Sequence, residues 1–501
     1  MKLVKTTFYT ILIIFLLSSY SNAQTYHWYF SDDSTGNPIG NDQYNNGSKL
    51  SPWKSLSKAN AMLAKLSSSD IATLYFDRGD IWAFDWAING VLKISSGTVT
   101  ITDYGSGKKP VFDGEIDFSN PPAGIIDPSP YRWHAVISVN SPNATIENIE
   151  IKRNYGMGII TSKNGMTVQD CVFHDSGATS IGNSTSPGAT SLNTTIQRNE
   201  FYNGQQLNFY KIYTGWGAAI GLVSCEATGS VIRYNKLSNI YGEGIIVGDC
   251  TVEYNFISDT YSAGIYCAPH KDDGGHIIIR YNLVVGTSDP TYYIAKTDGR
   301  KWSSMHGIGI TDEWPTGNND NCYQEVYSNI VIGCYRGIKI YTLYNDKLNM
   351  IPDNIPKADI YNNILADNRT NFDIGWSGGI SNYDEINIFN NKMIKSSTSK
   401  LGAQTAVESG LLPVAKVNIL KNEFWTKDET PSPNYNNTEN FNEGQILLNS
   451  LQAEKILNDL AEWYNIKNVN DVKFDYSTKK WHTGIVVGKI VAPINFKLSI
   501  N

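Results

Sequence analysis

The chain has 501 residues, a net charge of −7 and only 18% charged residues. It contains no basic block, which argues against a nucleic-acid-binding protein. Its 42 Gly, 30 Tyr and 12 Trp are typical of an all-β protein rich in turns rather than of a helical one.

The N-terminus predicts a signal peptide over residues 1–23. Lys2 and Lys5 precede an apolar run at residues 8–17, and small residues follow at the expected cleavage site, residues 21–23. The apolar run is too short for a membrane span, which needs about 20 residues, so a cleaved signal is favoured over a retained anchor. We therefore expect a secreted protein, extracellular or periplasmic, without stable membrane insertion.

A short unit recurs along the chain, most clearly at residues 234–265. There, YNKLSNIYGEGI is followed by YNFISDTYSAGI. An Asn, replaced once by Asp, recurs at these positions: Asn148, Asp170, Asn199, Asn235, Asn255, Asn282, Asn329, Asn363, Asn391 and Asn422. Several units continue with a second segment that contains a Gly, as in EGIIV, AGIYC, HGIGI and RGIKI. Fixed units separated by variable loops indicate a solenoid of short strands.

A parallel β-helix explains the recurring Asn. Each strand of such a fold pairs with the equivalent strand of the next turn, about 4.8 Å away. Asn side chains at one bend then form a ladder of amide hydrogen bonds, and we expect Asn235, Asn255 and Asn282 to be consecutive rungs. A β-sandwich or a propeller predicts no recurring Asn at one bend. We therefore predict an all-β fold, a right-handed parallel β-helix spanning roughly residues 70–430.

These repeats resemble those of the secreted right-handed parallel β-helix proteins of the pectate-lyase-like superfamily, which is rich in polysaccharide lyases and glycoside hydrolases. The resemblance covers roughly residues 25–430 and implies a β-helix domain over residues 24–430. It also implies a capping helix at 51–66, a first strand at 72–82 and first turns at 99–114. It indicates the fold more strongly than the reaction, because this fold hosts many chemistries.

The last part of the chain, residues 431–501, differs from the repeats. Residues 445–465 carry apolar side chains at helical spacing, and residues 484–500 predict one or two strands. We expect this segment to be a C-terminal cap, because the ends of a solenoid need a cover.

The six cysteines, Cys171, Cys225, Cys250, Cys267, Cys322 and Cys334, follow no metal-ligand spacing. Cys250 and Cys267 lie one repeat apart, which is compatible with a disulfide in an oxidising compartment and with burial in a β core. Both interpretations stay open.

Aligning the units on their glycines predicts which residues point outward together. The residues before the Gly are Glu243, Ala263, His306 and Arg336, and those two positions after it are Ile246, Tyr266, Gly309 and Lys339. Further along come Asp249, His270, Lys271, Asp312, Glu313 and Tyr341. In HGIGI either Gly307 or Gly309 could be the anchor, and Gly309 would move His306 off the column.

Two reactions fit this cluster. A lyase acting on a uronate must neutralise a carboxylate and remove the C5 proton. For that reaction we predict Arg336 and Lys339 at the carboxylate, His270 or His306 as base, and Tyr266 or Tyr341 at the leaving oxygen. A hydrolase would need a carboxylate pair from among Glu243, Asp249, Asp312 and Glu313. Cations outnumber well-placed carboxylates on the column, which favours the lyase.

Two insertions, residues 203–221 and 286–305, are expected to form the walls of the groove, where aromatic rings stack on sugars. The residues predicted to bind substrate are Lys271, Arg300, Trp302, Tyr341, Trp216 and Tyr213.

The expected partner is a polysaccharide or oligosaccharide, and we expect a monomer. A non-catalytic glycan-binding or adhesive solenoid is the alternative that needs no acid, base or cation. No cofactor is predicted as required, and no metal ligands are assigned. A Ca²⁺ ion held by Asp249, Asp272 and Asp273 stays possible, although two adjacent Asp beside glycines more often serve a turn.

Overall fold

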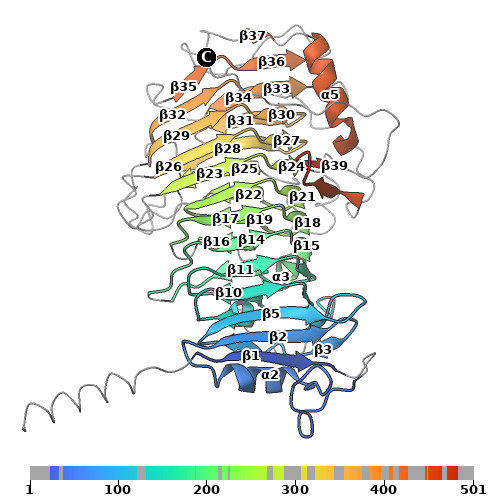
Figure 1. The fold of residues 1–501 in the computed structure, drawn as a ribbon. Coiled ribbons are helices and arrows are strands. Elements are labelled where there is room, and N and C mark those ends of the chain that lie inside the picture. Colours follow the sequence, from blue (N-terminus) through green and yellow to red (C-terminus); the bar gives the residue numbers. More distant parts are fainter. Residues whose placement is uncertain are drawn as a thin grey trace, which may run out of the picture.

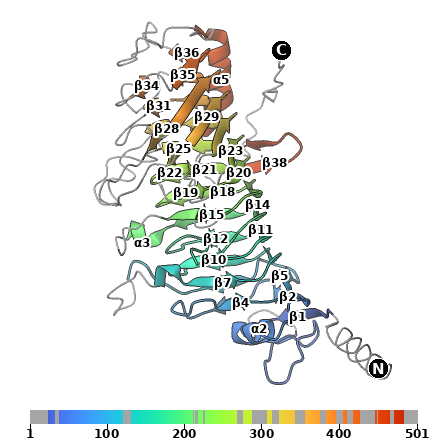
Figure 2. The same cartoon turned by 90° about the vertical axis from the view of Figure 1, so that its left-hand side faces the viewer.

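The strands of the protein stack into an elongated solenoid, with the N-terminal turns at one end and the later turns at the other (Figures 1 and 2). The computed structural model describes residues 23–32, 38–120, 131–186, 188–210, 212, 217–223, 226–267, 275–286, 306–312, 322–342, 355–374, 383–395, 405–409, 417–426, 446–447, 450–464 and 471–482.

Three long sheets run the length of the solenoid. Sheet 1 contains β1 (Thr25–Phe30), β2 (Ile71–Asp77), β5 (Thr98–Tyr104), β8 (Thr145–Glu147), β11 (Thr167–Gln169), β14 (Thr195–Gln197), β17 (Ser230–Arg233), β20 (Cys250–Glu253), β23 (His276–Arg280), β26 (Tyr323–Tyr327), β29 (Ile355–Tyr361), β32 (Tyr383–Phe389) and β35 (Val417–Leu420).

Sheet 2 contains β4 (Leu92–Ile94), β7 (Ala135–Val139), β10 (Met157–Thr161), β13 (Ile181–Asn183), β16 (Ala218–Leu222), β19 (Glu243–Val247), β22 (Ala263–Cys267), β25 (His306–Asp312), β28 (Arg336–Thr342), β31 (Thr370–Ile374) and β34 (Thr405–Ser409).

Sheet 3 contains β3 (Ile81–Ala83), β6 (Val111–Asp113), β9 (Glu150–Lys152), β12 (Val172–His174), β15 (Glu200–Gly204), β18 (Lys236–Ile240), β21 (Phe256–Thr260), β24 (Leu283–Val285), β27 (Ile330–Ile332), β30 (Ile364–Ala366), β33 (Lys392–Lys395), β36 (Glu423–Thr426) and β37 (Ile446–Leu447).

Each turn passes through sheet 1, then sheet 3, then sheet 2, and every strand pairs in parallel with its equivalent in the next turn. The predicted parallel β-helix is therefore confirmed. One strand was not predicted: β1 precedes the expected first strand and pairs with β2, with Thr25 opposite Ile71. The expected strand at 72–82 is divided into β2 and β3.

The inside of the solenoid is a continuous apolar core. Along sheet 1, one inward position is occupied by Ile146, Val168, Ile196, Ile232, Val252 and Ile279, which all lie fully buried. Phe173 and Phe201 stack in the same way on sheet 3, with ring centroids 5.0 Å apart. Similar side chains on successive turns thus pack on one another, which is why the sequence repeats.

The Asn ladder is present. In each step, one Asn Nδ2 donates to the Oδ1 of the next Asn at 2.9–3.0 Å, and the same Oδ1 also accepts from a backbone N–H. The rungs are Asn199, Asn235, Asn255, Asn282, Asn329, Asn363, Asn391 and Asn422. These buried amides satisfy the backbone groups that the bend removes from the sheets.

Two predicted rungs were misaligned by one residue. Asn148 and Asp170 have positive φ values of 59° and 55°, the conformation of Tyr234 and Tyr254, which directly precede the rungs Asn235 and Asn255. The rung position after Asp170 is held by Cys171, whose backbone N–H donates to Asn199 Oδ1 at 2.9 Å. Asn and Asp both tolerate the left-handed conformation, which explains why they occur there.

The N-terminal end is closed by α2 (Leu56–Leu63), as predicted (Figure 1). Its first turn is capped by the Ser55 side chain, which accepts from the Lys58 N–H at 3.0 Å. Leu56, Ala59 and Leu63 are buried in the core below the first turns.

Helix α5 (Ser450–Tyr464) lies along the side of the solenoid (Figure 1). The sequence instead predicted that this segment covers the C-terminal end. Its buried residues pack on the outward face of sheet 3, in a cluster that contains Phe256, Leu283, Val285, Ile332, Ile364, Ala366, Ile394, Ala453, Leu460 and Trp463. The hairpin of β38 (Lys473–Asp475) and β39 (Lys480–His482) continues this cover, because Trp481 Nε1 donates to the Tyr254 carbonyl at 3.0 Å. Residues 484–500 lie outside the described part of the chain.

We expect Leu460→Ala to lower the free energy of unfolding by about 2–5 kcal/mol, because it leaves a cavity between α5 and sheet 3. Leu460 is 1% exposed, whereas Leu451 on the same helix is 75% exposed. Leu451→Ala is therefore the matched control, with an expected change within about 0.5 kcal/mol. Urea unfolding measures both, and equal effects of the two substitutions would contradict the packing of α5.

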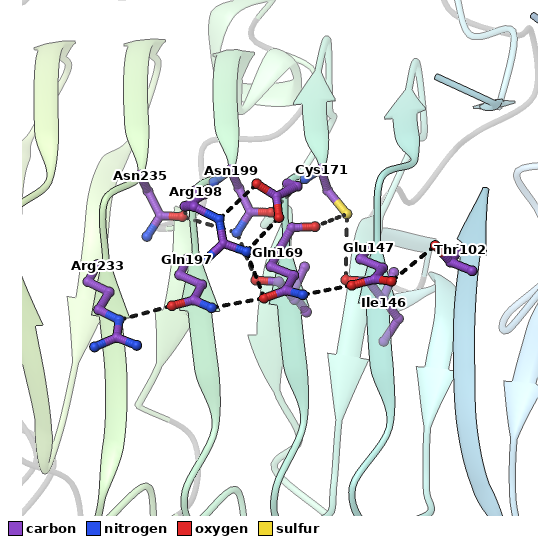
Figure 3. A network of polar contacts seen from close by, with 12 residues as sticks. Thr102, Ile146, Glu147, Gln169, Cys171, Gln197, Arg198, Asn199, Arg233 and Asn235 are labelled. Atoms are coloured by element: carbon purple, nitrogen blue, oxygen red, sulfur yellow. Dashed lines mark hydrogen bonds and ion pairs between the residues drawn. The ribbon is translucent and has the colours of Figure 1, made fainter. Parts of the chain in front are cut away.

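The outward face of sheet 1 carries a polar ladder (Figure 3). Gln169 Nε2 donates to Glu147 at 2.6 Å, and Gln197 Nε2 donates to Gln169 Oε1 at 2.8 Å. Thr102 and Arg233 continue it at either end, with hydrogen bonds of 3.1 and 3.0 Å. These side chains satisfy one another across the strands, which stabilises the sheet.

On sheet 3, His174 lies between two carboxylates. Its Nδ1 is 2.7 Å from Asp175 Oδ2, its Nε2 is 3.0 Å from Glu150 Oε1, and its ring stacks on Tyr202 at 4.5 Å. Burial lowers the pKa of His174, but the hydrogen bonds to Asp175 and Glu150 outweigh it, so the pKa is raised above 6.5. The resulting stabilisation is fully present below the unfolded pKa and is lost as the pH rises through the folded one.

We therefore expect His174→Gln to lower the free energy of unfolding by about 1 kcal/mol near pH 6 and by much less near pH 9. Thermal unfolding at the two pH values measures this difference. His27→Gln, at an exposed position on β1, is the control. A loss that is the same at both pH values would contradict a charged His174.

The cysteines Cys250 and Cys267 are buried in the core, as one of the two sequence interpretations expected. Burial raises the pKa of the Cys267 thiol well above its usual value. Cys225 lies outside the described residues. Among the helices in the described part of the chain, none is long and apolar enough to cross a membrane.

Candidate functional site

Sheet 2 carries a further group of titratable side chains outside the core, besides those on sheets 1 and 3. The outward residues of sheet 1 bond to one another, and the later turns of sheet 3 lie beneath α5. On sheet 2, strands β22, β25 and β28 bring two Tyr, a His, a Lys and an Arg together from three turns.

The register of these strands confirms the predicted columns. Ala263 pairs with His306, and His306 pairs with Arg336. Two positions after the anchor glycine, Tyr266 pairs with Gly309, and Gly309 pairs with Lys339. Gly307 is therefore the anchor of HGIGI, and His306 stays on the column.

Gly309 makes room for a contact between residues on different turns. A Cβ on Gly309 would lie 2.9 Å from the Tyr266 ring and 3.9 Å from the His306 ring. Across this bare position the hydroxyls of Tyr266 and Tyr341 form a hydrogen bond of 2.7 Å, although 75 residues separate them in the chain. The His306 and Tyr341 ring centroids are 6.3 Å apart. One imidazole and two phenols thus surround a single glycine.

Lys339 places a cation against this group. Its Nζ lies 3.7 Å from the centroid of the Tyr341 ring, which is a cation–π contact. Lys339 is 1% exposed, and a cation is expensive to bury without compensation. Buried titratable groups in contact with one another are a common feature of active sites.

Arg336 has a partner that the sequence did not reveal. It forms an ion pair with Asp373, which stands beside Lys339 on the next strand, β31. Asp373 was not found by aligning the units on their glycines, because this unit has Asn371 at the position of the anchor glycine. Arg336 is therefore partly neutralised by a carboxylate that also lies opposite Lys339 in the strand register.

Of the predicted carboxylates that lie on described strands, Glu243 and Asp312 have distant backbone positions. Glu243 lies on β19, four strand spacings or about 19 Å from Asp373 on β31. In the strand register, the position of Glu243 corresponds to Ala263 on β22 and to His306 on β25. Asp312 is six residues after His306, which is about 20 Å along the strand. Asp249 accepts a hydrogen bond from Thr228 at 2.5 Å, and a Cβ on Gly275 would clash with its carboxylate, so it is enclosed at a corner.

Part of one predicted wall is described. In the insertion at 203–221, α3 (Gln206–Phe209) packs beside the turn that leads into β19, where Phe209 and Tyr241 have ring centroids 4.3 Å apart. The remaining predicted residues lie outside the described part of the chain: Tyr213, Trp216, His270, Lys271, Arg300, Trp302 and Glu313. Asp272 and Asp273 do so as well. Within the described ranges, no group of three or more His, Cys, Asp or Glu is arranged to hold a metal ion.

Comparisons with known proteins agree with this fold. The family model described as a right handed beta helix region matches residues 134–313, which agrees with the predicted right-handed parallel β-helix. No curated protein sequence matches the chain.

Three solved structures illustrate the similarity. A lacto-N-biosidase from Eubacterium ramulus is 14% identical, with 79% of this chain and 68% of that chain covered and a TM-score of 0.48. An α-1,3-glucanase catalytic unit from Streptomyces thermodiastaticus is 12% identical, with 74% and 66% covered and a TM-score of 0.45. A mannuronic-acid-specific polysaccharide lyase from the human gut microbiota is 12% identical, with 88% and 95% covered and a TM-score of 0.44. The reaction therefore has to be argued from the residues of sheet 2.

Proposed function

We propose that this right-handed β-helix protein is a secreted carbohydrate-active enzyme, a polysaccharide lyase that cleaves an acidic, uronate-containing glycan by β-elimination. The observation that carries the proposal is the hydrogen-bonded pair of Tyr266 and Tyr341 with the buried Lys339 amine against the Tyr341 ring. This arrangement supplies proton-transfer groups and a cation at one point on the outward side of sheet 2.

In the proposed reaction, Lys339 neutralises the uronate carboxylate, which makes the C5 proton more acidic. Arg336, held by Asp373, adds positive charge on the same strand. His306 removes the C5 proton, the electron pair forms the C4–C5 double bond, and the bond from C4 to the glycosidic oxygen breaks. Tyr341, linked to Tyr266, gives its proton to the leaving oxygen.

The hydrolase alternative needs two carboxylates about 5–10 Å apart, and Glu243 has neither Asp312 nor Asp373 at that distance. Glu243 is about 19 Å from Asp373 and about 20 Å from Asp312, as measured along the sheet. The non-catalytic alternative does not require a His, a Lys and two Tyr in mutual contact.

The test is incubation of the full chain with a panel of acidic and neutral polysaccharides, with two readouts. Elimination gives unsaturated uronates that absorb in the ultraviolet, and every cleavage gives new reducing ends. Both signals together on an acidic glycan support the lyase. Reducing ends without the ultraviolet signal would make the enzyme a hydrolase, and neither signal would favour a binding protein.

A further inference from the structure

A hollow lies on the outward face of sheet 2, nearer the N-terminal end than the tyrosine pair. It has a volume of about 300 Å³ and is formed by β7, β10 and β13 with the loops that follow them. All its lining residues are uncharged, and most carry hydroxyl or amide groups. Such a lining suits a ligand with many hydroxyl and ring oxygens.

An exposed aromatic ring stands at the edge of this hollow. Trp133 is 52% exposed, and the Arg132 guanidinium lies 4.4 Å from its ring centroid. A large apolar ring left half in water costs free energy, and it offers a flat surface on which a sugar ring can stack.

Two asparagines that line the hollow present donors, Asn89 beside the start of β7 and Asn140 just after its end. Asn89 Oδ1 accepts from the Ala135 N–H at 3.1 Å, and Asn140 Oδ1 accepts from Ser162 Oγ at 2.7 Å. These bonds fix the carbonyl side of each amide, so each NH₂ group is left to donate elsewhere. Neither NH₂ group has a hydrogen-bond partner among the described residues. Fixed donors and an aromatic surface in one hollow are the recognition elements of a sugar site.

The hollow is in line with the tyrosine pair. Its floor includes Ser138 and Ile160, which belong to the same outward column as Tyr266. Between them the column passes through Gly182 and Gly221, which have no side chain, and then through Ile246, which packs against the tyrosine pair. From β10 to β22 there are four strand spacings, or about 19 Å. A chain of several sugars is long enough to span that distance.

We propose that the hollow beside Trp133 is a second glycan-binding site, which holds the polysaccharide several sugar units away from the tyrosine pair. The proposal takes its ligand class from the proposed function but does not depend on the reaction. Trp133 stacks on a sugar ring, while Asn89 and Asn140, at opposite ends of β7, donate to oxygens of the glycan.

The test is affinity gel electrophoresis of the full chain in gels that contain polygalacturonate, alginate or a neutral galactan. We expect at least one gel to retard the chain, and Trp133→Ala to weaken this binding about tenfold, since one stacked ring contributes about that factor. Tyr44→Ala, at a position 84% exposed in the N-terminal loop, is the matched control and should bind as before. No retardation in any gel, or equal retardation of the Trp133→Ala variant, would overturn the proposal.

A second measurement separates this site from the catalytic proposal. With the polymer as substrate, Trp133→Ala should raise KM and leave kcat unchanged, whereas with a trisaccharide neither constant should change. Retardation that depends on Trp133 without any cleavage would retain this site and reject the lyase. Cleavage with the same KM for polymer in both proteins would reject this site and retain the lyase.

Discussion

Replacing Tyr341 by Phe is expected to lower kcat on an acidic polysaccharide by about 10²–10⁴-fold, because the substitution removes the group that protonates the leaving oxygen. The ring stays in place beneath Lys339, so the cation–π contact at 3.7 Å is kept and the fold should not change. Steady-state rates from the ultraviolet absorbance of the product measure the effect.

The matched control is Tyr323→Phe. Tyr323 also has a hydroxyl engaged in a hydrogen bond, to Asp359 at 2.6 Å, but it lies on sheet 1. Loss of its hydroxyl should leave the rate almost unchanged. Tyr266→Phe tests the partner of the pair, and it should lower kcat less than Tyr341→Phe does. Full activity of Tyr341→Phe would remove the tyrosine pair from the mechanism.

The fold could be predicted from the sequence because the Asn that forms the repeated contact recurs in most turns. Asn235 and Asn255 recur where the backbone leaves one sheet for the next, and only a stack of parallel turns uses an amide there. Strand β1 contains no repeat motif, and 40 residues separate its last residue, Phe30, from the first residue of β2, Ile71. The pairing of β1 with β2 could therefore not be predicted from the sequence.

The position of α5 along the side of the solenoid could not be predicted from the sequence for a different reason. An amphipathic helix reveals that one of its faces is buried, but not against which surface. The surface had a signal of its own: Phe256 and Ile257 are neighbours in β21 and are both apolar, although they point to opposite faces of the sheet. A strand that is apolar on both faces needs a cover outside the solenoid, and α5 provides it.

In the candidate site, the anchor glycines were sufficient to place His306, Arg336, Tyr266 and Lys339 in their columns. Contacts between columns could not be predicted, because they depend on side-chain direction. Tyr341 extends over Gly309 to Tyr266, and this contact cannot be deduced from the spacing of residues in the sequence.

The Asn ladder predicts a large effect of a small substitution. Asn255→Ala removes the Oδ1 that accepts from the Asn235 backbone N–H and from Asn235 Nδ2, both at 3.0 Å. It also removes the donor to the Ile232 carbonyl at 2.9 Å. Each buried group left unsatisfied costs about 1–3 kcal/mol, so we expect a loss of roughly 3–6 kcal/mol in the free energy of unfolding.

Urea unfolding, with the m value unchanged, measures this loss. The control is Asn418→Ala, since Asn418 also donates to another Asn side chain, Asn387, at 2.8 Å, but from an exposed position on sheet 1. Its expected change is within about 0.5 kcal/mol, because water replaces an exposed hydrogen bond. Equal small changes in both variants would mean that water reaches the bend, and the ladder would then contribute little to the stability of the solenoid.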